Sequence, residues 1–486
     1  MLFNSYEYIF FFLPITFFIY FFLLNKRLIT GAKGFLVFAS LFFYSWWNVA
    51  YLPLILTSML FNYVIGNSLN ENFKKVQMHK KTLLGFGIAA NLALLGYFKY
   101  VDFFLENFNL LFDGSVPLLN LALPLAISFF TFQQIAYLVD SYRKETAEYD
   151  FLNYALFVTF FPQLIAGPIV HHKEMMPQFA SRWNLVKNYK NIALGLFVFS
   201  MGLFKKVVIA DTFAQWATAG FDNAAVLNFF EAWATSLSYT FQLYFDFSGY
   251  TDMAIGAALL FNIKLPINFN SPYKARDIQD FWRRWHITLS RFLRDYIYIP
   301  LGGNRKGSFR TYSNLMATFI LGGLWHGAGW TFVFWGFMHG GALVIHRFWK
   351  ALGFTMNAAL AWFITFNFIN ISWVFFRAKE FEDALKVLKG MFGFNGLMLP
   401  EKLEPYFPDF LGVYLNFSTV FLHIGAESKT TLYLISASLI VLLLPNSMEL
   451  RAKIVFTKWT LLLFASMSAY ALLHLNQMSE FLYFNF

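Results

Sequence analysis

The 486-residue chain contains no cysteine, and only 13% of its residues are charged. Without cysteine the chain can form no disulfide, no thiolate metal site and no cysteine acyl-enzyme. It also lacks a Walker loop, a GxGxxG fingerprint and an HExxH motif, which are the common signatures of nucleotide and zinc sites. No metal is therefore expected, and any nucleophile must be a hydroxyl.

Apolar residues are abundant instead. The chain is 58% hydrophobic and contains 66 Phe residues, whereas soluble chains are about 45–50% apolar. Long apolar runs recur from end to end: Tyr8–Leu24, Phe35–Trp47, Leu83–Tyr97 and Leu432–Leu444. Because a spanning helix needs roughly 20 mainly apolar residues, we predict about eleven to thirteen crossing or re-entrant segments. The fold class is an all-α polytopic membrane protein, with residues 1–486 as one membrane domain.

The first apolar run does not resemble a signal peptide. No positive region precedes Tyr8–Leu24 and no small-residue cleavage site follows it. Lys26 and Arg27 come after it, and by the positive-inside rule they hold that end in the cytoplasm. The N-terminus is therefore expected to face outward.

The apolar run over 151–170 lies between basic segments, and two interpretations of it remain open. Its interior reads FPQLIAGPIV, with Pro162, Gly167 and Pro168. The run either spans the membrane as a Pro-kinked helix or dips in and returns. Non-helical backbone at membrane depth survives only inside protein or beside a wet cavity.

Positive charge is concentrated between Lys264 and Arg310, which hold ten Lys or Arg and three Asp residues. Phe281, Trp285 and Leu289 recur at helical spacing and predict a helix that lies at the interface or packs under the helix bundle. Its cations either anchor the chain on anionic lipid or attract an anionic, nucleotide-bearing donor to a cytoplasmic mouth. The donor-binding candidates are Arg283, Arg284, Trp285, Arg305 and Lys306.

Two histidines stand in apolar or aromatic surroundings. His326 lies in LGGLWHGAGW, and His286 follows a tryptophan in the basic segment. Ionisable groups inside bilayers are rare and costly, so each predicts a functional site, although a packed, hydrogen-bonded role is the alternative. A neutral imidazole can take a proton from a hydroxyl and pass it to a leaving group. The chemistry that needs only this base and two positioned reactants is acyl transfer from a thioester to an alcohol.

Asp246 and Asp252 lie in a further apolar stretch, and their role stays open. They are either helix-packing groups bonded to Ser248 or Tyr250, or part of a proton relay with His326 in a transporter. A third class of function is a non-catalytic scaffold for a polymer-modifying complex.

Three long motifs carry a resemblance to a known family. They are FDFSGYTDMAIG, FNSPYKARDIQDFWRRWHITLSRFLRDYIYIPLGGNRKG and GLWHGAGWTFVFWGFMHG. Together with FPQLIAGPIV and WVFFRA (373–378), they resemble the membrane-bound O-acyltransferase superfamily. The match is best to its bacterial branch of alginate and peptidoglycan O-acetyltransferase membrane subunits.

The resemblance implies a fold, a site and partners. The fold would be a ring of helices around a central tunnel, with a catalytic core over 120–350 and a basic cytoplasmic or interfacial segment over 264–310. His326 would be the catalytic histidine and His286 the second active-site position. Candidates for the tunnel lining are Trp282, Trp325, Asp246 and Asp252.

The same resemblance implies an acetyl relay in the bacterial inner membrane. Acetyl-CoA would be the donor, a secreted SGNH-type protein the partner, and an extracytoplasmic polysaccharide or peptidoglycan the acceptor. Membrane lipid is expected around the chain, and no nucleic acid is expected as a partner.

The chain ends in FLYFNF, residues 481–486. One interpretation is an aromatic anchor at the headgroup level. The other is an acyl relay, because the pattern resembles the acyl-carrying tyrosine motif of the small subunit in teichoic acid D-alanylation systems. Tyr483 would then carry the acetyl group as a phenyl ester, which is more activated than a sugar ester.

Overall fold

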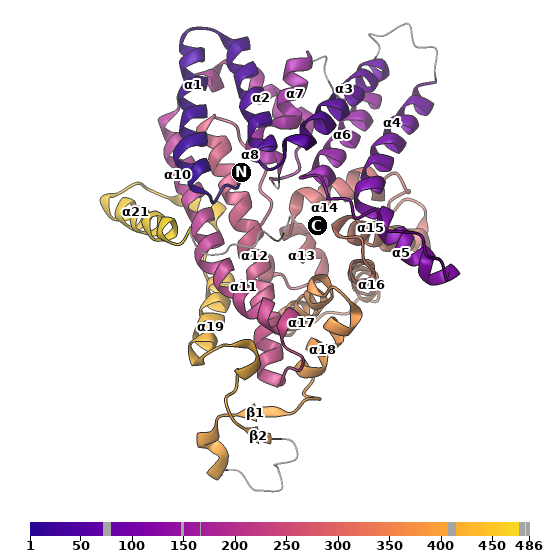
Figure 1. The fold of residues 1–486 in the computed structure, drawn as a ribbon, viewed down its shortest axis with the longest axis vertical. Helices are drawn as coiled ribbons and strands as arrows, with labels where there is room; N and C mark the ends of the chain where they lie inside the picture. Colours follow the sequence, from indigo (N-terminus) through magenta and orange to yellow (C-terminus); the bar gives the residue numbers. More distant parts are fainter. Residues whose placement is uncertain (71–78, 147–149, 166, 407–414, 476–481, 483–486) are drawn as a thin grey trace. The chain divides into compact units, whose positions relative to one another are not determined.

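The computed structural model describes residues 1–70, 79–146, 150–165, 167–406, 415–475 and 482 (Figure 1). Over these residues the chain is helical except for loops and one short parallel strand pair. The pair consists of β1 (Leu397–Leu399) and β2 (Leu415–Phe417), with Leu397 opposite Leu415. The all-α fold class is therefore confirmed.

The chain divides into two compact units. Unit 1 comprises Met1–Leu203, Tyr250–Ile267 and Val455–Leu475. Unit 2 comprises Phe204–Gly249, Asn268–Ile454 and Asn476–Phe486, of which Leu482 is described in the last segment. The long helix α12 (Phe229–Leu260) contributes residues to both.

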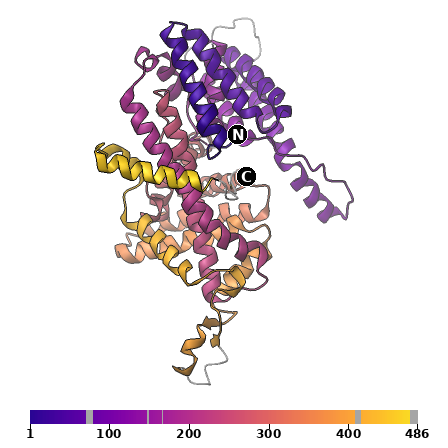
Figure 2. The same cartoon turned by 60° about the vertical axis from the view of Figure 1, so that its left-hand side comes forward.

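Unit 1 contains the N-terminal helices, drawn in indigo to purple in Figures 1 and 2. Its longer helices are α1 (Leu13–Asn25), α2 (Ile29–Ser45), α3 (Leu52–Leu69), α4 (Lys80–Leu95), α5 (Val101–Phe112), α6 (Ile127–Tyr142), α10 (Tyr189–Phe204) and α21 (Lys458–Leu473). Its shorter helices are η1 (Glu7–Phe12), η2 (Val49–Tyr51), η3 (Gly96–Tyr100), α7 (Phe151–Thr159), α8 (Phe161–Leu164), α9 (His172–Ala180) and η4 (Arg182–Leu185).

Small and amide side chains join the helices of unit 1. Asn62 of α3 and Asn91 of α4 exchange two buried amide hydrogen bonds, of 3.1 and 2.7 Å. Gly195 of α10 lies so close to Gly256 of α12 that a Cβ on either would come within 2.7 Å of the other's carbonyl oxygen. Close backbone approach at small residues and interhelical polar contacts are typical of helix packing in membranes.

Unit 2 contains the remaining elements. Its longer helices are α15 (Gly307–His326), α16 (Trp330–Ala351), α17 (Ala358–Arg377), α18 (Phe381–Met391) and α19 (Ser428–Leu443). Its shorter helices are η5 (Lys205–Ala210), α11 (Asp211–Thr218), η6 (Ala219–Asn223), η7 (Pro272–Lys274), α13 (Ile278–Arg284), α14 (Ile287–Leu293), η8 (Arg294–Tyr298), η9 (Glu401–Tyr406), η11 (Leu422–Ile424) and α20 (Ser447–Lys453).

Helices α15 and α16 form a tightly packed hairpin whose short connection begins at Gly327. A Cβ at Gly323 would overlap the Phe332 carbonyl oxygen, and one at Gly336 would overlap the Phe319 carbonyl oxygen. Only glycine permits this approach, because any side chain would force the helices apart. The hairpin therefore sets the position of His326, the last residue of α15.

Five helical runs of the described chain are long and apolar enough to cross a membrane: Glu7–Asn25, Val49–Leu69, Lys80–Phe112, Tyr189–Asn223 and Ala358–Arg377. The helices Lys429–Leu443 and Ser447–Lys453 meet the same criteria only when taken together, and they are bent by 53° at the break between them, so they form either a broken span or a re-entrant loop. Two shorter apolar helices are Ile29–Ser45 and Lys458–Leu473. Phe11 and Phe18 are each 64% exposed, as expected of side chains that face lipid. Our prediction of eleven to thirteen segments counted crossing and re-entrant segments together. The helices named here are only those long and apolar enough to cross a membrane, so the two numbers are not directly comparable.

The apolar run over 151–170 is broken. It forms the nine-residue α7 and the four-residue α8, and its backbone is non-helical over 167–170. A nine-residue helix is about 13.5 Å long, less than half the roughly 30 Å of a bilayer core. A single Pro-kinked spanning helix is therefore wrong for this run, and the interpretation in which the chain dips in and returns stays a prediction.

Candidate active site

His286 lies at a break between two helices of unit 2. Helix α13 ends at Arg284, α14 begins at Ile287, and His286 has a φ of 41° in the left-handed region. Non-glycine residues rarely adopt this conformation, and it persists only where the surroundings enforce it. The single helix predicted through residues 281–289 is therefore wrong, because it is interrupted at this histidine.

Asn268 enforces the break. Its backbone carbonyl accepts from the Ile287 N–H at 3.0 Å, and its side-chain Oδ1 accepts from the Thr288 N–H at 3.2 Å. These bonds satisfy backbone donors at the start of α14, which would otherwise have no partner. The Thr288 hydroxyl adds a third bond, to the same Oδ1, at 2.9 Å.

The same amide determines the tautomer of His286. The atom of Asn268 that accepts from the Thr288 N–H must be oxygen, which settles the orientation of the amide. His286 Nδ1 lies 3.1 Å from that oxygen, so it carries the proton and donates. In the neutral ring Nε2 is then an acceptor, and it is buried with no hydrogen-bond partner among the described residues. The arrangement leaves one imidazole lone pair for a substrate.

His326 is buried in an aromatic setting in the same unit, with 5% of its surface exposed. Its ring centroid lies 5.0 Å from that of Phe376 and 5.3 Å from that of Trp335. The Trp325 ring lies 4.9 Å from His326 and 6.4 Å from His286. The structure therefore brings both predicted histidines to one indole. Phe247 completes the setting of His286 at 4.7 Å.

A third buried histidine, His339 of α16, has both ring nitrogens bonded. The Trp282 indole N–H donates to its Nδ1 at 3.2 Å, so Nε2 carries the proton and donates to the Ser372 hydroxyl at 3.0 Å. That hydroxyl donates in turn to the Ile369 carbonyl. His339 therefore links α13, α16 and α17 and has no lone pair left for chemistry.

Two other residues predicted to line the tunnel, Trp282 and Asp252, lie in different units of the structure. Trp282 is buried between His339 and Phe319, with ring centroids 5.2 and 4.9 Å away. Asp252 is buried in unit 1, so it lies in the other unit from the two histidines. A Cβ on Gly327, the residue after His326, would overlap the Phe332 ring, so this position has no room for a side chain.

Asp246 of α12 has a partner that the sequence analysis missed. Lys206 of η5 lies 2.6 Å from its carboxylate and 2.8 Å from that of Asp211. All three side chains are at most 5% exposed. The available signal was a lysine inside the apolar run GLFKKVVIAD, followed five residues later by an aspartate.

The donor-binding candidates are not alike. Arg283, Arg305 and Lys306 are exposed, whereas Arg284 is half-buried and bonds Asp280 at 2.9 Å. Trp285 is buried and stacked on Phe281 at 5.7 Å. Three cations therefore remain accessible to an anion, and Trp285 packs in the core of unit 2.

The tail candidate Tyr483 lies outside the described residues. Its neighbour Leu482 is described and is 5% exposed. Over the part of the chain that the structure describes, no group of three or more His, Asp or Glu side chains is arranged to hold a metal ion.

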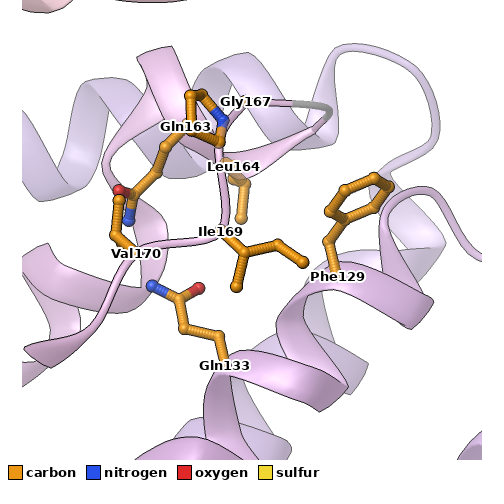
Figure 3. Close-up of a pocket in the computed structure, with 8 residues that line it drawn as sticks. Phe129, Gln133, Gln163, Leu164, Gly167, Ile169 and Val170 are labelled. Carbon is orange, nitrogen blue, oxygen red and sulfur yellow. The ribbon is translucent and has the colours of Figure 1, made fainter. Parts of the chain in front are cut away.

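Unit 1 has a small pocket at its broken segment (Figure 3). Its apolar lining includes Phe129, Leu164, Ile169 and Val170. Its side-chain amides are those of Gln133 and Gln163, which both donate to the Phe157 carbonyl, at 2.9 and 2.6 Å. Amide groups do not titrate, so this pocket can hydrogen-bond a ligand through its glutamines but its lining contains no acid or base.

Comparisons with known proteins identify the family. Residues 9–379 match the model of MBOAT, the membrane-bound O-acyltransferase family. The chain is 57% identical to the peptidoglycan O-acetyltransferase of Helicobacter pylori over 429 residues, covering 82% of this chain and 81% of the relative. It is 42% identical to the probable alginate O-acetylase AlgI of Pseudomonas aeruginosa, covering 82% and 76%.

A more distant relative is the teichoic acid D-alanyltransferase of Streptococcus thermophilus, 28% identical over 54% of this chain and 70% of the relative. The family model covers well over half of the chain, and the nearer relatives exceed 40% identity. The chain therefore belongs to the membrane-bound O-acyltransferase family, and it is a multi-pass membrane acyltransferase.

Proposed function

We propose that this chain is an O-acetyltransferase that moves acetyl groups from cytoplasmic acetyl-CoA across the inner membrane of a bacterium. The acceptors are hydroxyls of an extracytoplasmic polymer, and peptidoglycan is preferred to alginate because the peptidoglycan relative is the more similar, at 57% against 42% identity. The observation that carries the proposal is the pair of buried histidines, His286 and His326, whose ring centroids lie 6.4 and 4.9 Å from that of Trp325.

His326 is the general base of this reaction. It takes the proton of the attacking hydroxyl as the hydroxyl oxygen bonds to the thioester carbonyl carbon. The C–S bond then breaks, and CoA leaves as a thiol after receiving the proton from the imidazolium. One ester is formed, one thioester is broken and the histidine is regenerated.

His286 positions the donor. Its Nε2 can only accept a hydrogen bond, because Nδ1 donates to Asn268. The pantetheine arm of CoA carries amide N–H groups that suit this acceptor. Holding the thioester beside the base converts an encounter of two molecules into a reaction within one complex, which is a large source of rate.

The first acceptor is the phenol of Tyr483 in the C-terminal tail. The tyrosyl ester then passes its acetyl group to a secreted SGNH-type partner, which esterifies the polymer. A phenol has a pKa of about 10, so its ester transfers the acetyl group downhill to a sugar hydroxyl. The N-terminus faces outward, and the exposed cations Arg283, Arg305 and Lys306 attract the donor from the cytoplasm.

The test of the base is His326→Ala, measured in cells lacking their own copy of the protein. We expect polymer O-acetyl esters, released by mild base and quantified, to fall to background while the tagged protein keeps its level in the membrane. His474→Ala is the matched control, because His474 is half-exposed and bonds the Tyr470 carbonyl in unit 1. More than a few per cent of wild-type acetylation by His326→Ala contradicts the assignment and favours a scaffold.

The test of the relay is Tyr483→Phe, which removes one hydroxyl and keeps the aromatic ring. We expect polymer acetylation to be lost while acetyl-CoA binding to the purified protein is unchanged. Adding Phe481→Tyr to the Tyr483→Phe variant tests whether a phenol at another position of the tail restores polymer acetylation. Full acetylation by Tyr483→Phe contradicts the relay and leaves the tail as an aromatic anchor.

A further inference from the structure

The segment over 182–190, which reads RWNLVKNYK, takes no part in the chemistry described above. It connects α9 to α10 in unit 1 and includes η4. Its apolar side chains are exposed: Trp183 by 89%, Tyr189 by 79% and Val186 by 67%. Tryptophan is highly buried on average in soluble proteins, whereas Trp and Tyr are enriched where a membrane protein meets the lipid headgroups.

Four exposed cations belong to this segment or to the loop bonded to it: Arg182, Lys187, Lys190 and Lys264. Over the part of the chain that the structure describes, none of the four is paired with a carboxylate. Lys187 Nζ lies 5.9 Å from the ring centroids of both Phe17 and Phe21 of α1. Arg and Lys side chains form strong, charge-assisted hydrogen bonds to phosphate oxygens. These cations are therefore available to an external anion.

Amide side chains hold the backbone of the segment in place. Asn262 Nδ2 donates to the carbonyls of Asn184 and Val186, at 3.2 and 2.7 Å. Gln178 joins the second loop, because its Oε1 accepts from the Lys264 N–H at 2.8 Å and its Nε2 donates to the Lys264 carbonyl at 3.0 Å. The backbone is thus already ordered, so a ligand of the exposed side chains does not have to order it on binding.

The segment also lies where two apolar helical runs end. The run Tyr189–Asn223 begins in it, and the run Glu7–Asn25 ends close to Phe21, which Lys187 contacts. Both runs are long and apolar enough to cross a membrane. The ends of spanning helices lie at the depth of the headgroups, which is where aromatic and basic side chains together are most favourable.

We propose that residues 182–190, together with Lys264, form a binding site for an anionic glycerophospholipid. The exposed aromatic side chains enter the interfacial region, and the cations bind the headgroup phosphate. A soluble phosphate would occupy the cations and leave Trp183, Val186 and Tyr189 in water, whereas a lipid accommodates both kinds of side chain. The inference is independent of the proposed reaction.

Because the chain has no cysteine, one introduced thiol carries a fluorescent probe without background. A bimane attached in Val186→Cys is quenched by brominated acyl chains that touch it. The purified full-length protein is placed in phosphatidylcholine bilayers that contain brominated phosphatidylglycerol or brominated phosphatidylcholine at equal mole fraction. We expect the anionic lipid to bind beside the probe at least about fivefold more tightly, because each basic residue near a surface attracts anionic lipid by about that factor. Raising the salt concentration should lower this preference.

Three variants separate the site from net charge. Arg182→Gln, Lys187→Gln and Lys190→Gln combined should reduce the preference to less than about twofold. The matched control removes the same charge from exposed positions of unit 2, by Lys389→Gln, Lys402→Gln and Lys429→Gln, and should keep the wild-type preference. Asn262→Gly removes the bonds that hold the segment but permits the φ of 61° at this position. It should lower the preference at unchanged charge.

Wild-type preference in the triple variant of the segment overturns the proposal. So does an equal loss in the control, which would show attraction by net charge, and so does wild-type preference in Asn262→Gly, which would show that no ordered segment is needed. Equally weak quenching by both lipids would mean that protein or water covers the probe, and this outcome also contradicts the site. Inorganic phosphate and acetyl-CoA test for a soluble ligand: we expect neither to displace the brominated phosphatidylglycerol, and displacement by either refutes a lipid site.

Discussion

Replacing Asn268 with alanine should separate the orientation of His286 from the stability of unit 2. One amide oxygen accepts from His286 Nδ1, the Thr288 N–H and the Thr288 hydroxyl. Asn268→Ala leaves the first two donors buried without their partner, while the hydroxyl can rotate. Each unsatisfied buried donor costs about 1–3 kcal/mol, so we expect a loss of roughly 2–6 kcal/mol in the free energy of unfolding.

The same change should slow the transfer reaction. Without the Asn268 acceptor the His286 ring can rotate or change tautomer, and its Nε2 lone pair is no longer held in place. If the lost orientation is worth about 1.4–2.8 kcal/mol of the activation barrier, kcat/KM for acetyl-CoA falls roughly 10- to 100-fold. The assay is transfer of labelled acetyl groups by purified protein in proteoliposomes, corrected for the folded fraction.

Thr288→Val is the matched control for Asn268→Ala. It removes one of the three bonds but leaves His286 paired to Asn268. We expect a loss of about 1 kcal/mol in stability and transfer within about twofold of wild type. The reasoning is refuted if Asn268→Ala loses stability but transfers at the wild-type rate per folded molecule, because His286 would then need no orienting partner.

Two further predictions concern the hairpin and the cytoplasmic cations. Gly323→Ala should destabilise the protein by about 1–3 kcal/mol, because the added Cβ overlaps the Phe332 carbonyl oxygen. Gly329→Ala is the control, because its added Cβ meets nothing closer than 3.6 Å and should leave the stability unchanged. Thermal unfolding measures both variants, and equal melting temperatures would contradict the packing argument. Neutralising Arg283, Arg305 and Lys306 to Gln should weaken acetyl-CoA binding and flatten its dependence on salt, as titrations at several ionic strengths would show, and unchanged affinity would assign these cations to lipid anchoring.

Composition was sufficient to predict an all-α membrane protein, because apolar content and run length follow directly from the thickness of a bilayer. The breaks between helices were harder to predict. Pro162 and Gly167 signalled that the run over 151–170 is interrupted, since both residues are poor in helix interiors. Nothing comparable surrounds His286, where the residues on both sides have ordinary helix propensities.

The break at His286 depends on a tertiary contact. Asn268 lies 18 positions earlier and supplies both a carbonyl and an amide oxygen to the start of α14. A periodic pattern over residues 281–289 reports which side chains are buried, but it does not report a cap that comes from elsewhere in the chain. Lys206 was missed for a similar reason, because its partner Asp246 lies on another helix.

The choice of an amide beside His286 has a chemical consequence. A carboxylate in the position of Asn268 would also hold Nδ1–H, but it would favour the imidazolium form and remove the lone pair from Nε2. An amide oxygen fixes the ring with much less bias toward the charged form. The ring can then stay neutral in a buried aromatic setting, next to Phe247 and Trp325. The buried carboxylates of Asp211 and Asp246 are paired with Lys206 instead. This division keeps a neutral acceptor at His286 and confines these buried carboxylates to an ion pair with lysine elsewhere in unit 2.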